Sequence, residues 1–326
     1  MNNLNRILFT TKHRLLHCLF GLLLLIALPA NAFSFQFVDD GGNTIEITKP
    51  PSRVVSLVPS ITEILHTISA GDAVKAITYH DVYPAANAGK QIVGGYFAPS
   101  LDVIAAEKPD MVFISNLHEK VKSQFKNSNC QLVELETKSI EDSQEKILLL
   151  GKIFNKEKQA QALVQAINHQ LQTIARKVER IPPEERQRVI RLMGRDTVMT
   201  PGDGSFQNEM IRAAGGIPPQ LGRKGAVTPI SKEEWIKFNP QVIYGCGGDR
   251  KTAKAFFDRP GWKDVDAVRN GRIFYFPCEL TCRAATNTGR FVSWLSARIY
   301  SDLFSKEAFQ VRSEERRVGK ECASTC

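Results

Sequence analysis

Short apolar runs alternate with helical patterns along most of the chain. Residues 53–57 form a run rich in β-branched side chains, which predicts a strand, and residues 60–65 follow with helical spacing. Ser60 suits the N-cap of this helix, and Glu63 stands three positions later, as in a capping box. Strands separated by helices are typical of parallel βαβ units. Further strands are predicted at residues 73–78, 111–115 and 131–134.

A different pattern covers residues 141–181, where apolar side chains recur at helical spacing and Gly151 is the only glycine or proline. Pro182 and Pro183 end this pattern. A helix of about 25 residues would span about 40 Å, because each residue adds ~1.5 Å. The region is therefore long enough to join two domains rigidly.

After the two prolines the alternation of strands and helices restarts. Residues 188–192 repeat the character of residues 53–57, and residues 232–245 match residues 101–114 more closely. Each of these two longer segments predicts a short helix, then a proline, then a strand. Asp102 and Glu233 fall at equivalent places in them.

These patterns predict an α/β fold with two Rossmann-like lobes. Each lobe contains a parallel sheet, one long α-helix joins the lobes, and a ligand cleft lies between them. The N-terminal lobe covers residues 33–140, the linking helix region covers residues 141–181, and the C-terminal lobe covers residues 182–311.

The N-terminus has the pattern of a secretory signal peptide. Basic residues precede an apolar run at residues 19–28, and Ala30-Asn31-Ala32 suits a cleavage site. The apolar run is short for a membrane span, which needs about 20 residues. We expect residues 1–32 to be removed and the mature protein to be a soluble monomer in a bacterial periplasm.

The C-terminal end contributes nothing to the predicted fold. Residues 312–322 resemble a common sequencing-adapter oligonucleotide read in frame, and the alternative is a solvated charged tail, so we treat residues 312–326 as a non-native tail. The rest of the mature chain carries a net charge of about +5, too weak to indicate a nucleic-acid partner.

Several motifs together resemble one family of proteins. Gln207–Ile211 with Gly215-Gly216 suits its second lobe, and residues 53–63, 79–84 and 101–110 suit its first. The chain is similar to the helix-linked (class III) periplasmic substrate-binding proteins of ABC importers for iron-siderophores, haem or cobalamin. The resemblance implies a non-enzymatic receptor that holds a metal chelate (an iron complex, haem or a corrinoid) between its lobes and delivers it to an inner-membrane permease.

The resemblance also assigns a role to Asp102 and Glu233. In this family one acidic residue on each lobe meets arginines of the permease, and these two residues fall on those positions. The first is usually glutamate, so Asp102 is a small departure. The alternative interpretation is that both acids only stabilise helix N-termini, which is favourable by roughly 0.3–1 kcal/mol.

The candidate cleft residues follow predicted strands, because ligands of open parallel sheets lie beyond the carboxyl ends of the strands. His80 and His118 are either polar lining residues or metal ligands. The family places aromatic rings against the ligand where Tyr79 and Tyr96 stand, and the alternative is ordinary edge packing. The full set is Ser60, Tyr79, His80, Tyr96, Phe97 and His118 in the first lobe, and Arg195, Cys246, Cys278, Cys282 and Arg283 in the second.

Three of the cysteines are expected to cluster at the cleft. Cys246 and Cys278 each follow a predicted strand, and Cys282 lies about one helical turn after Cys278. Cys130 precedes its strand and should lie at the far side of the first lobe as an isolated thiol.

The state of these three cysteines stays open at this level. One disulfide can form, either Cys278 with Cys282 or Cys246 with one of the two, because the periplasm is oxidising. Reduced thiolates, together with His80, are alternatively candidate ligands of a soft metal or of the metal of a chelate. Inert thiols are the third interpretation.

Catalytic motifs are absent from the sequence: there is no phosphate-binding GK[ST] loop and no C-x-x-C pair, and residues 202–205 indicate only a turn. The chain is therefore not expected to be an enzyme. The alternative function is a cysteine-based periplasmic metal-binding or redox sensor protein on the same fold.

Overall fold

The computed structural model describes residues 34–81, 87–194 and 197–305. The predicted signal peptide, Arg195 and residues 312–326 lie outside the described residues. Within these ranges, none of the helices combines the length and the apolar character that a membrane crossing requires. Residues 34–37 and 44–49 belong to a small unit of their own, which contains β2 (Thr44–Ile47) and all but the last residue of β1 (Phe35–Val38). These two strands pair with each other.

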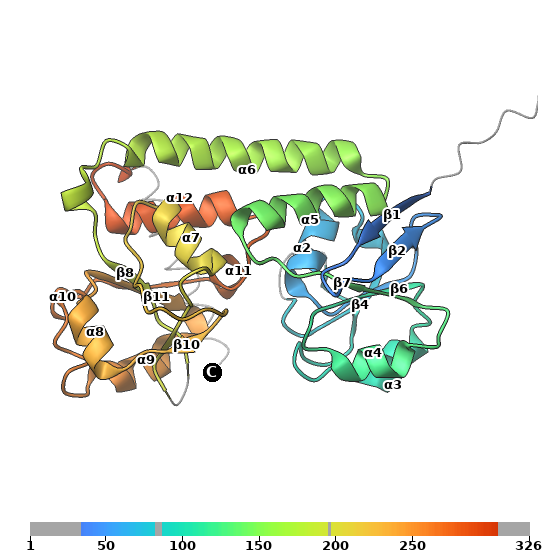
Figure 1. Cartoon of the computed structure of the whole chain (residues 1–326), viewed down its shortest axis with the longest axis horizontal. Helices are drawn as coiled ribbons and strands as arrows, with labels where there is room; N and C mark the ends of the chain where they lie inside the picture. Colours follow the sequence, from blue (N-terminus) through green and yellow to red (C-terminus); the bar gives the residue numbers. More distant parts are fainter. Residues whose placement is uncertain (1–33, 82–86, 195–196, 306–326) are drawn as a thin grey trace, which may run out of the picture. The chain divides into compact units, whose positions relative to one another are not determined.

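The first lobe contains a five-stranded parallel sheet in the order β5-β4-β3-β6-β7. Its central strands β3 and β6 are buried at every residue, which explains their unbroken apolar runs. Helices α3 and α4 lie on one side of the sheet and α2 on the other (Figure 1). The elements are β3 (Val54–Ser56), α2 (Pro59–Thr67), β4 (Val74–Ile77), β5 (Gln91–Ile92), α3 (Leu101–Ala106), β6 (Met111–Ile114), α4 (Glu119–Phe125) and β7 (Gln131–Glu134).

The second lobe contains a three-stranded parallel sheet in the order β12-β11-β8 and a small antiparallel pair, β9 with β10. Two apolar clusters fill the two faces of the larger sheet. The elements are β8 (Val189–Arg191), β9 (Met199–Thr200), α7 (Phe206–Ala213), β10 (Thr228–Pro229), α8 (Lys232–Phe238), β11 (Val242–Cys246), α9 (Arg250–Phe257), α10 (Asp266–Arg269), β12 (Ile273–Phe276), α11 (Cys278–Thr281) and α12 (Thr288–Ile299).

The predicted repeat is present in both lobes. The path from α3 to β6 matches the path from α8 to β11, and in both a residue with positive φ follows the helix and precedes a proline: Lys108 at 47° and Asn239 at 45°. The neighbouring strands share a register as well, because Ser56 pairs with Phe113 in the first lobe and Arg191 with Tyr244 in the second. These shared details confirm the expected pair of α/β lobes.

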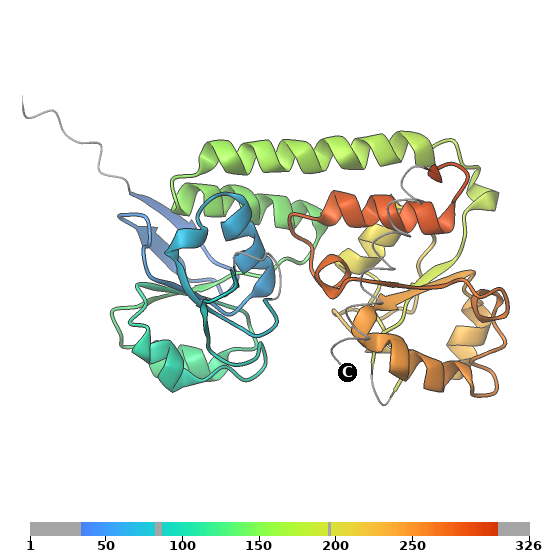
Figure 2. The same cartoon turned by 180° about the vertical axis from the view of Figure 1, so that it is seen from behind.

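The linking region consists of two helices rather than one. Helix α5 (Ile140–Ile153) ends near Asn155, whose φ of 54° reverses the chain, and α6 (Glu157–Val178) returns beside α5 and continues beside α12 of the second lobe (Figures 1 and 2). The close packing of α5 against α6 requires a glycine at position 151, because a Cβ atom there would lie 2.5 Å from the Cβ of Ala160. Helix α6 is the long connection, since 22 residues span about 33 Å.

The predicted start of α2 is wrong by two residues. Its N-cap is Val58, not Ser60, and no side chain caps it. Pro59 occupies the first turn, where its missing N–H costs nothing and its fixed φ suits the helix. Glu63 is therefore not part of a capping box, and its carboxylate is free for contacts with the second lobe.

Candidate functional site

A cavity of about 1040 Å³ lies between the strand ends of the first lobe and the loops of the second. Its size is at the upper end of the roughly 300–1,000 Å³ that small-molecule sites occupy. The first lobe contributes Val58, Pro59, Ser60, His80, Tyr96, Phe97, Glu136, Thr137 and Lys138, and the second contributes residues 203–207 and 222–226 with Cys278, Cys282 and Arg283.

Seven of the predicted cleft residues line this cavity, namely Ser60, His80, Tyr96, Phe97, Cys278, Cys282 and Arg283. Cys246, Tyr79 and His118 do not line it. Tyr79 is 61% exposed, and its ring packs against the ring of His80 with centroids 4.3 Å apart. It therefore supports His80 from outside the cavity.

His118 is a structural residue of the first lobe. It is 3% exposed, its Nδ1 accepts a hydrogen bond from the backbone N–H of Ser115 at 2.9 Å, and its Nε2 lies 2.6 Å from the carbonyl oxygen of Tyr96. Burial lowers the pKa of His118, so the ring is neutral and its Nε2–H donates to that carbonyl. Both ring nitrogens are used within the protein, which excludes metal ligation in this arrangement.

His80 presents a hydrogen-bond donor to the cavity. The backbone N–H of Tyr96 donates to its Nδ1 at 3.1 Å, so the neutral ring carries its proton on Nε2. Burial, aided by the nearby charge of Arg283, lowers the pKa of His80 despite the opposite effect of Asp81. Metal ligation through Nε2 would move the proton to Nδ1 and break the bond from Tyr96. The geometry thus favours His80 as a donor over His80 as a metal ligand.

Aromatic rings form one wall of the cavity. Tyr96 and Phe97 pack edge to face with centroids 5.0 Å apart, and Phe97 is 77% exposed. The hydroxyl of Tyr96 donates to Ser115 Oγ at 3.1 Å, and burial raises the pKa of Tyr96, so its phenol stays protonated. An exposed ring beside a fixed one suits stacking against a flat ligand.

Arg283 and Glu63 connect the lobes beside the cavity. Arg283 donates to the carbonyl oxygens of Pro59 and His80, both at 3.2 Å, and its Nη1 lies 3.5 Å from Glu63 Oε2. The hydroxyl of Thr286 and the side-chain amide of Asn287 also donate to Glu63. Burial raises the pKa of Glu63, and Arg283 partly opposes this shift. No local sequence pattern marks Glu63 as a site residue, because its partners are more than 200 positions away.

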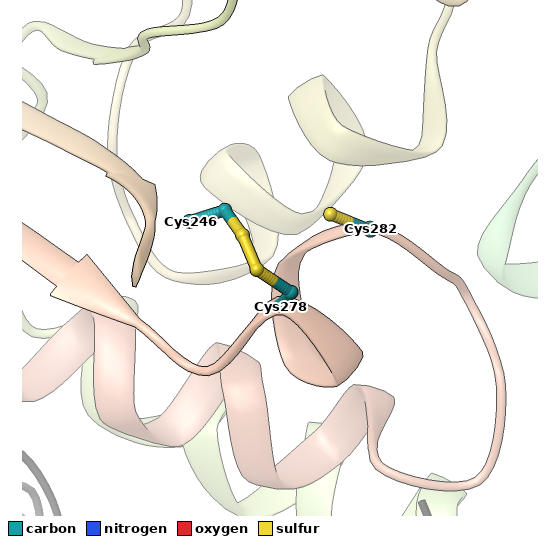
Figure 3. Close-up of side chains that lie close together, drawn as sticks. All are labelled: Cys246, Cys278 and Cys282. Carbon is teal, nitrogen blue, oxygen red and sulfur yellow. A yellow bond between two sulfur atoms is a disulfide. The ribbon is translucent and has the colours of Figure 1, made fainter. Parts of the chain in front are cut away.

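The three cysteines cluster in the second lobe as expected. Cys246 and Cys278 form a disulfide with a Cα–Cα distance of 4.8 Å, Cys282 is a free thiol, and the three sulfurs lie within 4.8 Å of one another (Figure 3). Among the pairings left open by the sequence, Cys278 with Cys282 is therefore excluded. Cys246 is paired with Phe276 in neighbouring parallel strands, which brings Cys278, two residues later, next to Cys246.

Arg191, which no local sequence pattern marks as a site residue, contacts Cys282. It ends strand β8, is 2% exposed, and donates from Nη2 to Cys282 Sγ at 3.2 Å and from Nη1 to the carbonyl of Thr281. Burial disfavours its charge, but Cys282 and Tyr244 more than offset this effect, so the pKa of Arg191 is raised. A cation thus lies directly behind the thiol at the cavity.

Cys130 lies apart from this cluster. It packs against the core of the first lobe, and burial raises the pKa of its thiol to about 12. It lines a separate cavity with Leu132 and Glu134. Cys130 is therefore an unreactive thiol at neutral pH.

Two loops of the second lobe complete the cavity, and glycine residues allow these loops to pack closely together. The turn at residues 202–205 packs against the loop at residues 222–226, since a Cβ atom on Gly202 would lie 2.6 Å from the carbonyl oxygen of Gly225. The carboxylate of Asp203 accepts from the backbone N–H groups of Leu221 and Gly222 at 2.8 and 2.7 Å. The sequence indicated only a turn here, because no local signal shows that two such loops meet.

Asp102 and Glu233 have equivalent surroundings. Ser100 caps α3 and Ser231 caps α8, and each acid is the second residue of its helix. Both side chains are exposed. These positions allow both acids to stabilise their helix N-termini, and they also leave both carboxylates accessible to a partner protein.

Residues 54–280 match the periplasmic binding protein family, and the chain belongs to it. It is a substrate-binding protein of the ABC transporter type, in the helix-linked class, and not an enzyme. It is 28% identical over 279 residues to the uncharacterized ABC transporter substrate-binding lipoprotein YvrC of Bacillus subtilis (strain 168), covering 82% of this chain and 87% of YvrC.

Two further comparisons involve proteins named for haem. The High-affinity heme uptake system protein IsdE of Staphylococcus aureus (strain MRSA252) is 23% identical over 192 residues, which is 56% of this chain and 64% of IsdE. The periplasmic heme-binding protein RhuT from Roseiflexus sp. RS-1 shares the fold, with a TM-score of 0.70 and 21% identity over 77% of this chain and 99% of RhuT.

Proposed function

We propose that the protein is a periplasmic receptor that captures a metal chelate (an iron complex, haem or a corrinoid) and delivers it to an ABC permease in the inner membrane. The names of IsdE and RhuT support a chelate as the cargo of this chain. The observation that carries the proposal is the cavity of about 1040 Å³ between the lobes, with an aromatic wall and a cationic rim.

The lining of the cavity suits a large, flat, anionic ligand. Tyr96, Phe97 and Phe206 offer rings against which a macrocycle can stack. Lys138, Arg223, Lys224 and Arg283 outnumber the acids Glu136 and Asp203 in the lining. Glu234 partly neutralises Arg223 at 2.8 Å, whereas the described residues provide no ion pair for Lys138 or Lys224. These two lysines are suited to the carboxylates of a chelate.

The experiment is a binding titration of the purified mature protein with hemin, aquocobalamin and ferrichrome, monitored by absorbance and equilibrium dialysis. We expect one of the three to bind with 1:1 stoichiometry. The spectrum of any chromophore that copurifies gives independent evidence. If none of the three binds and no chelate copurifies, the proposed function is wrong.

A matched pair of variants tests the location of the site. Phe97→Ala removes a ring that lines the cavity and is exposed in the free protein. A ligand that covers this ring gains at least ~1.4 kcal/mol from the contact, so we expect the variant to bind about tenfold more weakly. Ile236→Ala removes an exposed apolar side chain of α8 outside the cavity and should leave the affinity unchanged. Equal effects of the two variants would place the ligand elsewhere.

A redox sensor remains the second candidate, because a free thiol lies beside a disulfide at the cavity. A sensor needs a cysteine pair that changes state, whereas a receptor keeps the disulfide between Cys246 and Cys278. Mapping the free thiols by mass spectrometry across a series of glutathione buffers separates the two. A pattern of free thiols that changes within the physiological range would favour the sensor.

A further inference from the structure

Cys282 differs from the other two cysteines of its cluster. Its sulfur lies within 4.8 Å of Cys246 and Cys278, which are bonded to each other, and neither neighbour can pair with Cys282 unless that bond breaks. An oxidising compartment therefore leaves Cys282 as a thiol. This thiol is exposed and lines the cavity. The disulfide thus leaves Cys282 as the free thiol of the cluster (Figure 3).

The buried side chain of Arg191 points at the sulfur of Cys282 from the protein interior. Its guanidinium is buried, its Nη2 points at Cys282 Sγ from 3.2 Å, and its Nε has no hydrogen-bond partner among the described residues. No carboxylate of the described residues forms an ion pair with it. The sulfur of Cys282 therefore accepts a charge-assisted hydrogen bond from a buried cation, and this contact would stabilise the sulfur as a metal ligand.

We propose that Cys282 donates a thiolate to the metal of the bound chelate. This inference rests on the proposed function and narrows its substrate class. Thiolates are established ligands of haem iron, and hydrogen bonds to the sulfur tune such ligation, which is the position that Arg191 occupies.

The cargo must then keep an open coordination position on its metal. A planar macrocycle, either haem or a corrinoid, leaves positions above and below its plane, whereas a ferric siderophore surrounds its iron with hard oxygen donors. Phe97 comes from the first lobe and Cys282 from the second. A flat chelate in this cavity would then be contacted by the ring from the first lobe and by the sulfur from the second.

The test uses hemin as the probe with the full mature chain, its Cys282→Ser variant and its Cys130→Ser variant. Serine still accepts the hydrogen bond from Arg191, so the substitution removes the sulfur and retains that contact. We expect the visible and electron paramagnetic resonance spectra of the wild-type complex to show a thiolate ligand. Cys282→Ser should lose this signature and weaken binding at least tenfold, and Cys130→Ser should change neither.

A second measurement needs no variant. Iodoacetamide should alkylate Cys282 in the free protein and not in the hemin complex, as mapped by mass spectrometry. Cys130 is the internal control, because burial raises its pKa to about 12 and keeps it unreactive in both states. Alkylation of Cys282 at the same rate with and without bound hemin would overturn the proposal.

The outcomes separate this inference from the proposed function. If hemin binds the wild type and Cys282→Ser with the same spectrum and with affinities within twofold, thiolate ligation is wrong and the receptor function stands. If only ferrichrome binds, the receptor function again stands and thiolate ligation is wrong. If hemin, aquocobalamin and ferrichrome all fail to bind the wild type, both proposals fall.

Discussion

Arg283 of the second lobe lies 3.5 Å from Glu63 of the first, although 220 residues separate them along the chain. Their side chains are 10% and 0% exposed. Thr286 and Asn287 donate to the same carboxylate, so one glutamate receives three partners from the other lobe. The pair is the polar link between the lobes at the edge of the cavity.

Removal of one partner of this link should destabilise the protein strongly. Glu63→Ala leaves the charge of Arg283 largely buried and unpaired, which costs about 3–5 kcal/mol in comparable buried pairs. The double variant Glu63→Ala/Arg283→Ala should cost less than the sum of the single variants, because the two residues share an interaction. Urea unfolding of the four proteins measures this coupling. Additive effects would show that the link contributes no net coupling.

The pH dependence of stability should reveal whether burial or the charge of Arg283 has the larger effect on the pKa of Glu63. Burial raises its native pKa above 4.5, so the native state binds this proton more tightly than the unfolded state. The contribution of Glu63 to stability is therefore fully present below pH 4.5 and decreases as pH rises through the native pKa. The stability of the wild type relative to Glu63→Gln should fall from pH 4.5 upwards. A relative stability that grows with pH would mean that Arg283 outweighs burial.

Charge reversal of Asp102 and Glu233 should block delivery without affecting capture. Both acids are exposed in the first turn of a helix and line no part of the cavity. The double variant Asp102→Lys/Glu233→Lys should abolish transport into cells or proteoliposomes, with the ligand affinity within twofold of the wild type. Glu141→Lys is the matched control, since it reverses an exposed first-turn acid of α5 at the same helix-end cost. Loss of ligand affinity in the double variant would contradict a docking role.

The disulfide should contribute more to stability than a bridge between Cys278 and Cys282 would. It closes a loop with a sequence separation of 32, for which the chain-entropy estimate is about 3–4 kcal/mol. Cys246→Ser/Cys278→Ser should therefore lower the free energy of guanidinium-induced unfolding by this amount, and Cys282→Ser should lower it by much less. Equal losses would indicate that packing around the cysteines, rather than the loop, is responsible.

Local sequence signals predicted the frame of the fold. Buried strands such as β3 and β6 appear as unbroken apolar runs, and the repeated order of helix, proline and strand indicated two similar lobes. The predicted helix boundaries were wrong where the backbone conformation of a single residue determines where a helix begins or ends. Asn155 turns the predicted single helix into a hairpin, and Pro59 moves the start of α2.

The site was predictable only as far as strand ends determine it. Because the carboxyl ends of parallel strands share one edge, the sequence indicated His80, Phe97 and Cys282 as cleft residues, and the structure places them at the cavity. Glu63 and Arg191 gain their importance from partners in other elements, which no local pattern reveals. The choice of Cys246 as the partner of Cys278 likewise depends on strand neighbours.

The shared register of the two lobes shows where the chemistry of the site can vary while the backbone stays the same. Ser56 and Arg191 stand at the same backbone position, since each pairs with the third residue of its central strand. Ser115 and Cys246 correspond in the same way, because both follow that residue by two positions. One copy of the repeat thus carries hydroxyls where the other carries a guanidinium and a sulfur. Exchanging a few side chains at these strand ends would change the chemistry beside the cavity and leave the surrounding scaffold unchanged.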